Sequence, residues 1–376
     1  MSTVERCRVH LLVQHLSERR GPSCAWYDSR ESVLVRLVDS DGRTGWGEAC
    51  LRPGVVEAAS QLGAGLVGLD ASQHSVLVDG LQASSADPWA VSALAIALDD
   101  LRARALGVPV ADLYGGRRRD RVRPYASSGG YHPERGPEEL WGPEVAEARA
   151  AGFDAFKLRI GRFEPRRELP LLAALRQQVG DAFDLLCDGN GAYTLREAIA
   201  VGRVLEQLGF VWFEEPMIRE RGSVRHPGYE KLAAALDIAV AGGEGLTSRG
   251  ELLSLLERGA VDVVQPDVTI CGGIGEALFV AELAALRGIG FAPHCWGGAV
   301  AVAATLQLLA VVPHPAEVPD RDGPFLEHDI FENAMRSELA TEAIKVRGGA
   351  VSIPAGPGLG IELDEEVIRR FDVLGG

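Results

Sequence analysis

Short apolar runs alternate with amphipathic helical stretches over the last two thirds of the chain, and this rhythm constrains the fold more than any other feature. Eight runs follow one another from about residue 122 onward: 123–127, 153–159, 183–188, 210–214, 238–244, 261–268, 289–294 and 325–328. Such alternation is typical of strands and helices in repeated βα units. It fits a closed (β/α)₈ barrel, although a doubly wound open sheet has the same order of elements.

Ionisable residues at the end of nearly every run favour the barrel. They are Arg159, Asp188, Glu214, Glu244, Asp267, His294 and Glu327. In a barrel the carboxyl ends of the strands converge on one mouth, whereas in an open sheet they lie along a line. The pattern therefore predicts a single site built from the ends of successive strands.

The N-terminal part of the sequence has a different pattern. Strand-type alternation covers residues 4–16 and 32–38, and the turn residues Asp39-Ser40-Asp41-Gly42 lead into a return strand at 45–48. Helical periodicity follows, ending with a segment at 87–106 that has Asp87 at its cap position and Pro88 at its first helical position. We expect an α+β domain over residues 1–120, the barrel over 121–340, and a C-terminal segment, 341–376, that returns to the N-terminal domain.

The connection between the first two strands, residues 17–30, combines charged residues, Gly and Pro with the adjacent aromatic residues Trp26 and Tyr27. This composition fits a mobile lid in which Trp26 and Tyr27 contact a substrate, and it also fits an ordinary surface loop.

Charge and cysteine usage exclude several functional classes. The 38 Lys and Arg residues against 53 Asp and Glu residues give a net charge of −15, which repels phosphate backbones and anionic membrane surfaces, so we expect no nucleic-acid or membrane partner. No signal sequence and no membrane-length apolar stretch is recognisable. The 6 cysteines contain no CxxC pair, so we expect free thiols and a cytoplasmic location.

Three of the strand-end residues are acids on consecutive strands. Asp188, Glu214 and Glu244 repel one another at a common barrel edge unless a cation neutralises them, and carboxylate oxygens select Mg²⁺ or a similar hard ion. The alternative is three independent caps or ion-pair partners. Three acids together favour a divalent metal site.

The next two strands predict an acid/base pair. A carboxylate at Asp267 can hold one nitrogen of His294 and make the other nitrogen a stronger base, although a lone histidine is more often structural. Lys157 and Arg159 share one face of the second strand, because side chains two residues apart point the same way. They are expected to bind a substrate carboxylate, unless they only neutralise the acids around them.

These motifs resemble the enolase superfamily, mandelate racemase subgroup, over essentially the whole chain. The resemblance rests on Lys157-Leu158-Arg159, Asp188-Gly189-Asn190, Glu214-Glu215-Pro216, Gly243-Glu244, Gln265-Pro266-Asp267, Gly272-Gly273, Pro293-His294 and Phe325-Leu326-Glu327. It implies a modified (β/α)₇β TIM barrel with an N-terminal α+β capping domain. It also implies a homo-oligomer, because family members commonly associate.

The same resemblance implies roles for individual residues. Asp188, Glu214 and Glu244 hold an essential Mg²⁺, and His294, oriented by Asp267, is the general acid/base, as in enolase-type sites generally. Glu327 is a hydrogen-bonding electrophile beside the substrate carboxylate, and Lys157 binds that carboxylate. The substrate is expected to contact Trp26, Tyr27, Asn190 and Trp296.

One residue departs from the pattern of the family's racemases. Their second basic position on this strand is a lysine that removes a proton from the face opposite the histidine, whereas here it is Arg159. A guanidinium group stays protonated at ordinary pH and is a poor base. The sequence therefore favours one-face chemistry: dehydration of a sugar acid to a 2-keto-3-deoxy acid.

Two related reactions and two other functional classes stay open. The Tyr125-Ala126-Ser127 strand and the Pro357-Gly358-Leu359-Gly360 tail also resemble sugar-lactone cycloisomerases, and racemisation or epimerisation of a hydroxy acid is a third possibility. Residues 271–275 faintly resemble a nucleotide-binding turn but lack the full glycine spacing. A non-catalytic metal- or ligand-binding barrel is the remaining alternative.

Overall fold

The computed structural model describes residues 2–84, 87–217, 228–313 and 324–375. The N-terminal domain is built on a three-stranded antiparallel sheet of β1 (Val4–Arg20), β2 (Tyr27–Asp39) and β3 (Thr44–Ala49), in that order. The helices α1 (Val55–Leu66), α2 (His74–Ala83) and α3 (Pro88–Leu106) accompany it. Asp87 caps α3 as predicted, because its side chain accepts hydrogen bonds from the first N–H groups of the helix.

A glycine allows the sheet and α3 to pack closely. A Cβ atom on Gly47 of β3 would lie 1.8 Å from the carbonyl oxygen of Ala93 in α3. Only glycine permits this approach between strand and helix.

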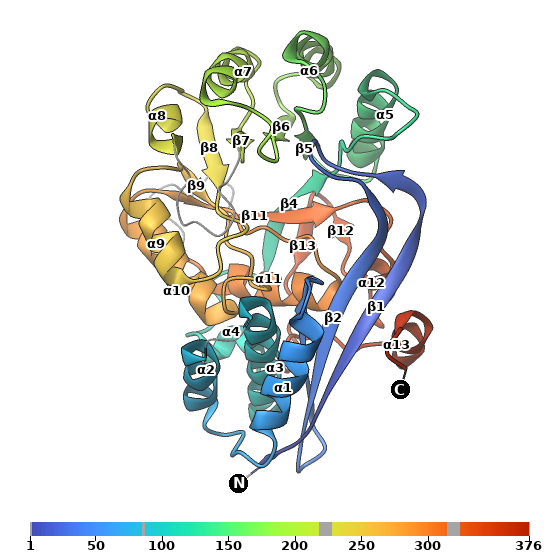
Figure 1. Ribbon diagram of the computed structural model, residues 1–376, viewed down its shortest axis with the longest axis vertical. Coiled ribbons are helices and arrows are strands. Elements are labelled where there is room, and N and C mark those ends of the chain that lie inside the picture. Colours follow the sequence, from blue (N-terminus) through green and yellow to red (C-terminus); the bar gives the residue numbers. More distant parts are fainter. Residues whose placement is uncertain (1, 85–86, 218–227, 314–323, 376) are drawn as a thin grey trace.

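The prediction of a connecting loop at residues 17–30 is wrong over most of its length, because these residues lie mostly in strands. β1 continues to Arg20 and β2 begins at Tyr27, so that only residues 21–26 connect them. A register shift between His15 and Arg20 breaks the alternation that marks the strand in the sequence. Figure 1 shows the two strands as a long arm that extends alongside the barrel toward β5.

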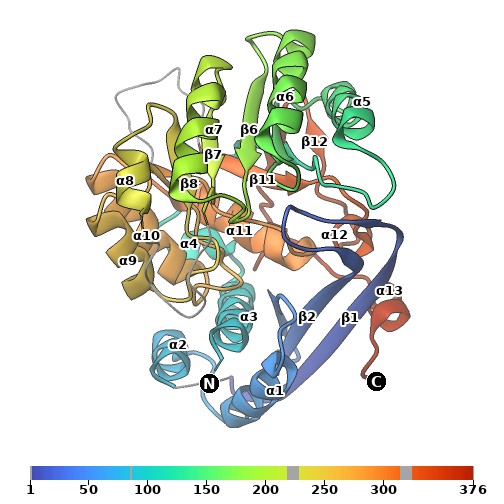
Figure 2. The same cartoon turned by 45° about the horizontal axis from the view of Figure 1, so that its top comes forward.

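The described residues of the second domain contain eight parallel strands, as predicted. Their hydrogen-bonded order is β11-β4-β5-β6-β7-β8-β9-β10, and helices surround them (Figures 1 and 2). The strands are β4 (Arg121–Ser127), β5 (Ala155–Arg159), β6 (Asp184–Asp188), β7 (Trp212–Glu214), β8 (Ala239–Gly242), β9 (Val263–Val264), β10 (Gly290–Phe291) and β11 (Phe325–Asp329). Inside the barrel, aromatic rings such as Tyr125 and Trp212 pack edge to face.

Helices follow the strands in the order that the sequence predicts. They are α6 (Pro165–Val179), α7 (Leu195–Gln207), α8 (Tyr229–Ala233), α9 (Arg249–Glu257), α10 (Ile274–Leu286) and α11 (Ala299–Val311). Four further described helices were not predicted: α4 (Val110–Leu113), α5 (Pro137–Ala150), α12 (Ala334–Ser337) and α13 (Glu365–Phe371). Of all these described helices, none is long and apolar enough to cross a lipid bilayer.

The C-terminal segment returns in two stages. The hairpin of β12 (Val346–Arg347) and β13 (Ala350–Ser352) first pairs antiparallel with β4 of the barrel. The chain then reaches α13 (Glu365–Phe371) beside β1, where Nδ1 of His10 lies 2.8 Å from Oδ2 of Asp372. The six cysteines are free thiols, as predicted.

Candidate active site

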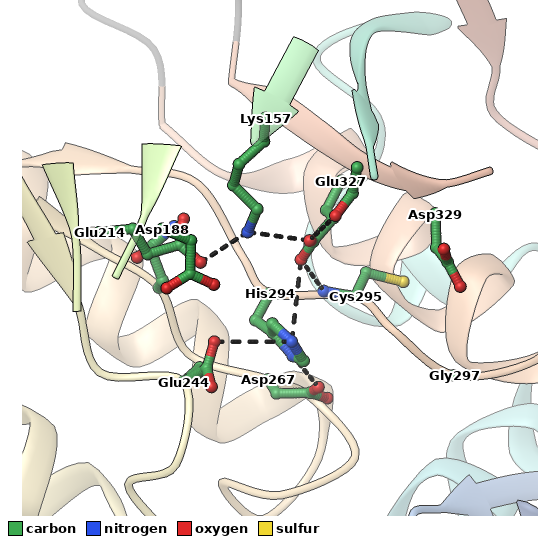
Figure 3. Close-up of polar contacts among 12 residues, drawn as sticks. Lys157, Asp188, Glu214, Glu244, Asp267, His294, Cys295, Gly297, Glu327 and Asp329 are labelled. Carbon is green, nitrogen blue, oxygen red and sulfur yellow. Dashed lines mark hydrogen bonds and ion pairs between the residues drawn. The ribbon is translucent and has the colours of Figure 1, made fainter. Parts of the chain in front are cut away.

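Asp188, Glu214 and Glu244 form an acidic cluster at the carboxyl ends of three adjacent strands (Figure 3). Asp188 ends β6 and pairs in register with Glu214 at the end of β7, whereas Glu244 lies in the loop after β8. Gly243 turns this loop with a φ of 111°, a value that favours glycine. One oxygen from each carboxylate lies within 4.8 Å of the other two, so the structure brings together the predicted metal-ligand residues.

Glu214 is held by three donors. Nζ of Lys157 lies 2.5 Å from Oε1, while Trp212 Nε1 and Gln265 Nε2 donate to Oε2 over 3.1 and 2.7 Å. These contacts fix the carboxylate of a fully buried glutamate.

Asp188 is held by its own loop. The backbone N–H and the side-chain Nδ2 of Asn190 each donate to this carboxylate over 2.8 Å, and Asn190 has a φ of 45°. Burial raises the pKa of Asp188 above its ordinary value, and the negative charges of Glu214 and Glu244 raise it further. Three carboxylate oxygens that repel one another in this way fit a hard divalent cation, which would neutralise them.

His294 lies opposite the acidic cluster in the loop after β10. Its Nδ1 lies 2.6 Å from Oδ2 of Asp267, and its Nε2 is 3.6 Å from Oε2 of Glu244 and 3.9 Å from Oε2 of Glu327. The carboxylate on Nδ1 orients the ring and leaves Nε2 facing the cluster.

The charges around His294 determine its protonation. Burial by itself lowers the pKa of His294, but the carboxylates of Glu244, Glu327 and Asp267 outweigh burial and raise the pKa to about 10. A cation held at Glu244 would cancel part of this attraction and bring the imidazole pKa closer to neutral pH.

Lys157 bridges two carboxylates. Its Nζ lies 2.9 Å from Oε1 of Glu327, in addition to the contact with Glu214. Burial alone disfavours the ammonium, but Glu214 and Glu327 raise the pKa of Lys157 well above its ordinary value. Lys157 is therefore a fixed positive charge beside the cluster.

Glu327 accepts hydrogen bonds in this arrangement. Ser127 Oγ donates to its Oε1 over 2.7 Å and the backbone N–H of Cys295 donates to its Oε2 over 3.0 Å. Burial favours the neutral acid, but Lys157 and His294 outweigh burial and hold the pKa of Glu327 below its usual range. An ionised Glu327 has no proton to donate, so the predicted electrophile role requires a proton gained when substrate binds.

Arg159 is buried on the same strand face as Lys157 and points toward the loop after β4. Its Nη1 donates to the carbonyl oxygen of Ser128 over 2.8 Å, and its Nη2 lies 3.4 Å from Ser127 Oγ. Burial tends to lower the pKa of Arg159, but Asp188 and Glu327 outweigh it and raise the pKa further. The guanidinium therefore cannot act as a base.

Two of the predicted substrate-binding residues line a cavity next to this site. Tyr27 and Trp296 pack with ring centroids 5.0 Å apart, and both face a cavity of about 210 Å³ whose wall also includes Arg159. Trp26 packs instead on Arg162, whose guanidinium lies 3.8 Å from the indole ring. Substrate contact by these residues and by Asn190 stays a prediction.

Several residues of the site were not predicted to have a role. Gln265, in the same Gln265-Pro266-Asp267 motif as Asp267, holds Glu214, and Ser127 holds Glu327. Arg30, part of the predicted connection at 17–30, lines the cavity. The position of Ser127 at the end of a strand could have indicated its role. Nothing in the sequence places Arg30 near the barrel.

Models of two protein domains match this chain. The model described as enolase C-terminal domain-like matches residues 143–367. The model of the mandelate racemase/muconate lactonizing enzyme N-terminal domain matches residues 20–115. The first match lies over the barrel and the C-terminal segment, and the second lies over the N-terminal domain.

Characterised relatives and solved structures resemble the chain over nearly its whole length. A D-galactarolactone cycloisomerase from Agrobacterium fabrum is 36% identical, with 97% of each chain covered. A D-gluconate dehydratase from Thermoproteus tenax is 32% identical over 99% of this chain and 74% of its own length. The structure of L-talarate/galactarate dehydratase from Salmonella typhimurium, liganded with Mg and L-lyxarohydroxamate, has a TM-score of 0.85 and 28% identity, covering 99% of this chain and 93% of that one.

Proposed function

This chain belongs to the enolase superfamily, with the N-terminal domain of the mandelate racemase/muconate lactonizing enzyme family, and on that premise we propose that it dehydrates a sugar acid to a 2-keto-3-deoxy acid with the help of Mg²⁺. The observation that carries this proposal is the acid/base pair beside the acidic cluster: Asp267 holds His294 by Nδ1, and Nε2 faces the cluster. The second basic position is an arginine, which supports one-base chemistry.

The acidic cluster, Lys157 and the cavity wall each have a part in the proposed site. Asp188, Glu214 and Glu244 would hold Mg²⁺, which would supply Lewis-acid stabilisation of negative charge on the substrate carboxylate. The fixed ammonium of Lys157 lies beside the same position and adds electrostatic stabilisation. The cavity wall around Arg159 and Trp296 positions the rest of the substrate.

The proposed reaction needs one group that first accepts a proton and later donates it. Nε2 of His294 takes the proton on the carbon next to the carboxylate, and the C–H electron pair moves toward that carboxylate. When this electron pair moves back and forms a double bond between the two carbons, the bond between the neighbouring carbon and its hydroxyl oxygen breaks. The imidazolium gives its proton to the leaving hydroxide, so water leaves, and the enol product rearranges to the 2-keto acid.

Cycloisomerisation of a sugar lactone is the second candidate function. It begins with the same proton abstraction, but the ring oxygen leaves in place of a hydroxyl group. The similarity to a D-galactarolactone cycloisomerase over 97% of both chains favours this alternative. Epimerisation is less well supported, because Arg159 occupies the place of a second base.

A substrate screen in heavy water tests the proposal. The purified protein with MgCl₂ is incubated with aldonic acids, aldaric acids and their lactones, and keto-acid formation and hydrogen exchange at the α-carbon are followed. Keto-acid formation is the expected result. Ring opening without loss of water identifies the cycloisomerase, and exchange without elimination identifies an epimerase. No reaction and no exchange with any of these compounds would overturn the proposal.

A second histidine provides a matched control. His294→Asn is expected to abolish both exchange and product formation. His74 also pairs with a carboxylate, Nε2 lying 2.7 Å from Oδ1 of Asp99, but it belongs to α2 in the N-terminal domain. His74→Asn is expected to leave the activity unchanged.

A further inference from the structure

The cavity beside the acid/base pair contains hydrogen-bond donors that the protein does not use. The β1–β2 arm contributes Tyr27 and Arg30 to its wall, and the barrel contributes Ser128, Arg159 and Trp296. Because Arg159 ends β5 and Trp296 follows His294 by two residues, the cavity adjoins the proposed reaction site. It is the natural place for the part of a substrate remote from the reacting carbon.

Arg30 has a buried nitrogen without a partner. Its residue is 5% exposed; Nη2 donates to Asp329 over 2.9 Å and Nε lies 3.4 Å from the carbonyl oxygen of Glu332. Nη1 has no hydrogen-bond partner in the part of the chain that the structure describes. A buried donor of a charged group is costly when unsatisfied, so this nitrogen indicates a missing acceptor.

Trp296 offers a second unused donor in the same wall. Its ring stacks under the Arg30 guanidinium at 3.9 Å, and its Nε1 is buried without a hydrogen-bond partner among the described residues. Two neighbouring unsatisfied donors are the arrangement expected for an oxygen-rich group held by both.

The charge balance at the buried end of the cavity favours an anion. Arg30 and Arg159 are both positively charged there, and Asp329 pairs with Arg30 alone. Arg159 forms its hydrogen bonds with Ser127 and Ser128 and has no ion pair with a carboxylate of the described residues. The acids that act on Arg159, Asp188 and Glu327, belong to the reaction site and do not contact its guanidinium. A second carboxylate of the substrate would pair with the two guanidinium groups, whereas a hydroxyl group would not neutralise them.

The carboxylates elsewhere around the cavity are already engaged or lie at its exposed rim. Glu332 accepts from Gln14 and from Ser17, and Glu144 accepts from Ser128 Oγ and the Gly129 N–H. Glu18 pairs with Arg135, and Glu147 is exposed. These acids do not supply the acceptor that Arg30 Nη1 and Trp296 Nε1 lack.

We infer that the substrate is a sugar diacid or its lactone, whose second carboxylate is bound in this cavity by Arg30 and by Trp296 Nε1. The inference rests on the proposed function for the other end of the molecule, where the first carboxylate lies beside Lys157. A planar guanidinium with a free N–H and an indole N–H together match the two oxygens of a carboxylate.

Matched acid pairs test the inference. D-Galactarate and D-galactonate, like D-glucarate and D-gluconate, differ only in the oxidation of one terminal carbon. The diacid of a pair is expected to have a kcat/KM on the order of 100-fold higher, since a site built to bind a charged group rejects the analogue that lacks it. Equal or better turnover of the monoacid would overturn the inference while leaving the proposed function intact.

A binding measurement separates the two proposals. Thermal unfolding of His294→Asn with MgCl₂ and each acid reports binding without turnover. If no acid or lactone is turned over by the wild type, the proposed function fails. A larger rise in Tm with the diacids still supports the diacid site, and an equal rise with both members of each pair contradicts it.

Variants of the two donors complete the test. Arg30→Gln is expected to bring the diacid-to-monoacid ratio of kcat/KM close to one. Trp296→Phe keeps an aromatic ring but removes Nε1–H, and a fall of about 10-fold in the ratio is expected; this variant decides the matter if Arg30→Gln does not fold. The control is Arg19→Gln, which removes an exposed arginine of β1 that pairs with Asp28 and is expected to leave the ratio unchanged. An unchanged ratio in folded Trp296→Phe contradicts the inference.

Discussion

The carboxylate of Glu48 lies at the N-terminus of α11, where the backbone N–H of Gly298 donates to it over 2.6 Å. Ala301 N–H and Ser32 Oγ donate to the same carboxylate over 2.9 and 2.8 Å. Glu48 belongs to β3 of the N-terminal domain, whereas Gly298 closes the loop that carries His294. One buried side chain thus connects the small domain to the loop of the acid/base pair.

Replacing Glu48 is expected to destabilise the protein and to disturb this loop. Glu48→Ala leaves the N–H groups of Gly298 and Ala301 buried without an acceptor. Each unsatisfied N–H is expected to lower the free energy of unfolding by about 1–3 kcal/mol. Urea unfolding measures the loss, and kcat is expected to fall with it. Glu31→Gln, at an exposed position of β2, is the control and should change neither quantity. Unaltered stability of Glu48→Ala would show that water replaces the carboxylate.

Asp267→Asn is expected to reduce kcat by about 10²–10⁴-fold, the usual contribution of general acid/base catalysis. The amide presents an N–H in place of one carboxylate oxygen and so favours the wrong tautomer of His294. KM should change much less than kcat, as steady-state kinetics can show. The same substitution at Asp99, which pairs with His74, is the control and should leave kcat near that of the wild type. A kcat close to the wild-type value for Asp267→Asn would remove this residue from the mechanism.

Asp188→Asn is expected to stabilise the metal-free protein and to weaken its binding of Mg²⁺. With EDTA present the variant should unfold at a higher temperature than the wild type near neutral pH, because one of three mutually repelling carboxylates is gone. With MgCl₂ at about 100 times its Kd the wild type should gain about 2.7 kcal/mol, and the variant much less. Asp184→Asn, at the other end of β6, should respond to Mg²⁺ as the wild type does. An equal Mg²⁺ response of Asp188→Asn would exclude this residue as a ligand.

His328 is expected to make the folded state sensitive to acid. Burial, and next the charge of Arg336, lower the pKa of His328 from 6.5 to about 4 in the folded protein. Above pH 6.5 the imidazole is neutral in both states and its contribution to stability is complete. As the pH falls from 6.5 to 4 the unfolded chain takes up a proton that the folded chain does not, so stability falls by up to about 1.4 kcal/mol per pH unit.

The variant His328→Gln isolates this effect. The difference in unfolding free energy between wild type and variant should shrink steadily as the pH is lowered through that window, because other titrating groups are common to both proteins. Urea unfolding at several pH values measures the difference. A pH-independent difference would assign the acid sensitivity to other groups.

Arg162 holds the connector between β1 and β2 above the acidic cluster. Its Nη2 donates to the carbonyl oxygens of Pro22 and Ala25 over 2.6 and 2.7 Å, and Ser23 Oγ donates to Gly189, next to Asp188. Arg162→Gln should loosen the connector and raise KM by about 10-fold, with a smaller effect on kcat. Faster proteolysis within residues 21–26 would accompany the change.

Arg167→Gln is the control for this substitution. Arg167 is an exposed arginine of α6 that pairs with Glu138, outside the connector. Its replacement should leave KM and the rate of proteolysis unchanged. If Arg162→Gln has the KM of the wild type, the connector does not take part in binding.

The elements that the sequence predicts correctly are those with a strong local signal. Runs of apolar residues mark the strands, and the caps and periodicity mark helices such as α3. α5 was missed because Gly142 and Pro143 lie within it and its polar residues give no clear apolar face. Packing of Leu140, Trp141 and Val145 in the core stabilises it nonetheless.

The composition of the acidic cluster and the acid/base pair was determined by the sequence itself, because a parallel barrel brings the ends of its strands to one mouth. Tertiary structure alone decided how these groups meet. It places Glu244, Asp267 and His294 in loops beyond their strands, and it inserts Lys157 between Glu214 and Glu327.

The cavity of Arg30 and Trp296 belongs entirely to the tertiary structure. These residues come from different domains, and only the folding of the β1–β2 arm alongside the barrel brings them into contact. Local patterns report which face of a strand or helix is buried, but they do not report which distant side chain lies against it. The sequence therefore indicates which type of reaction the protein can catalyse. The substrate that the site accepts depends on contacts between distant parts of the chain.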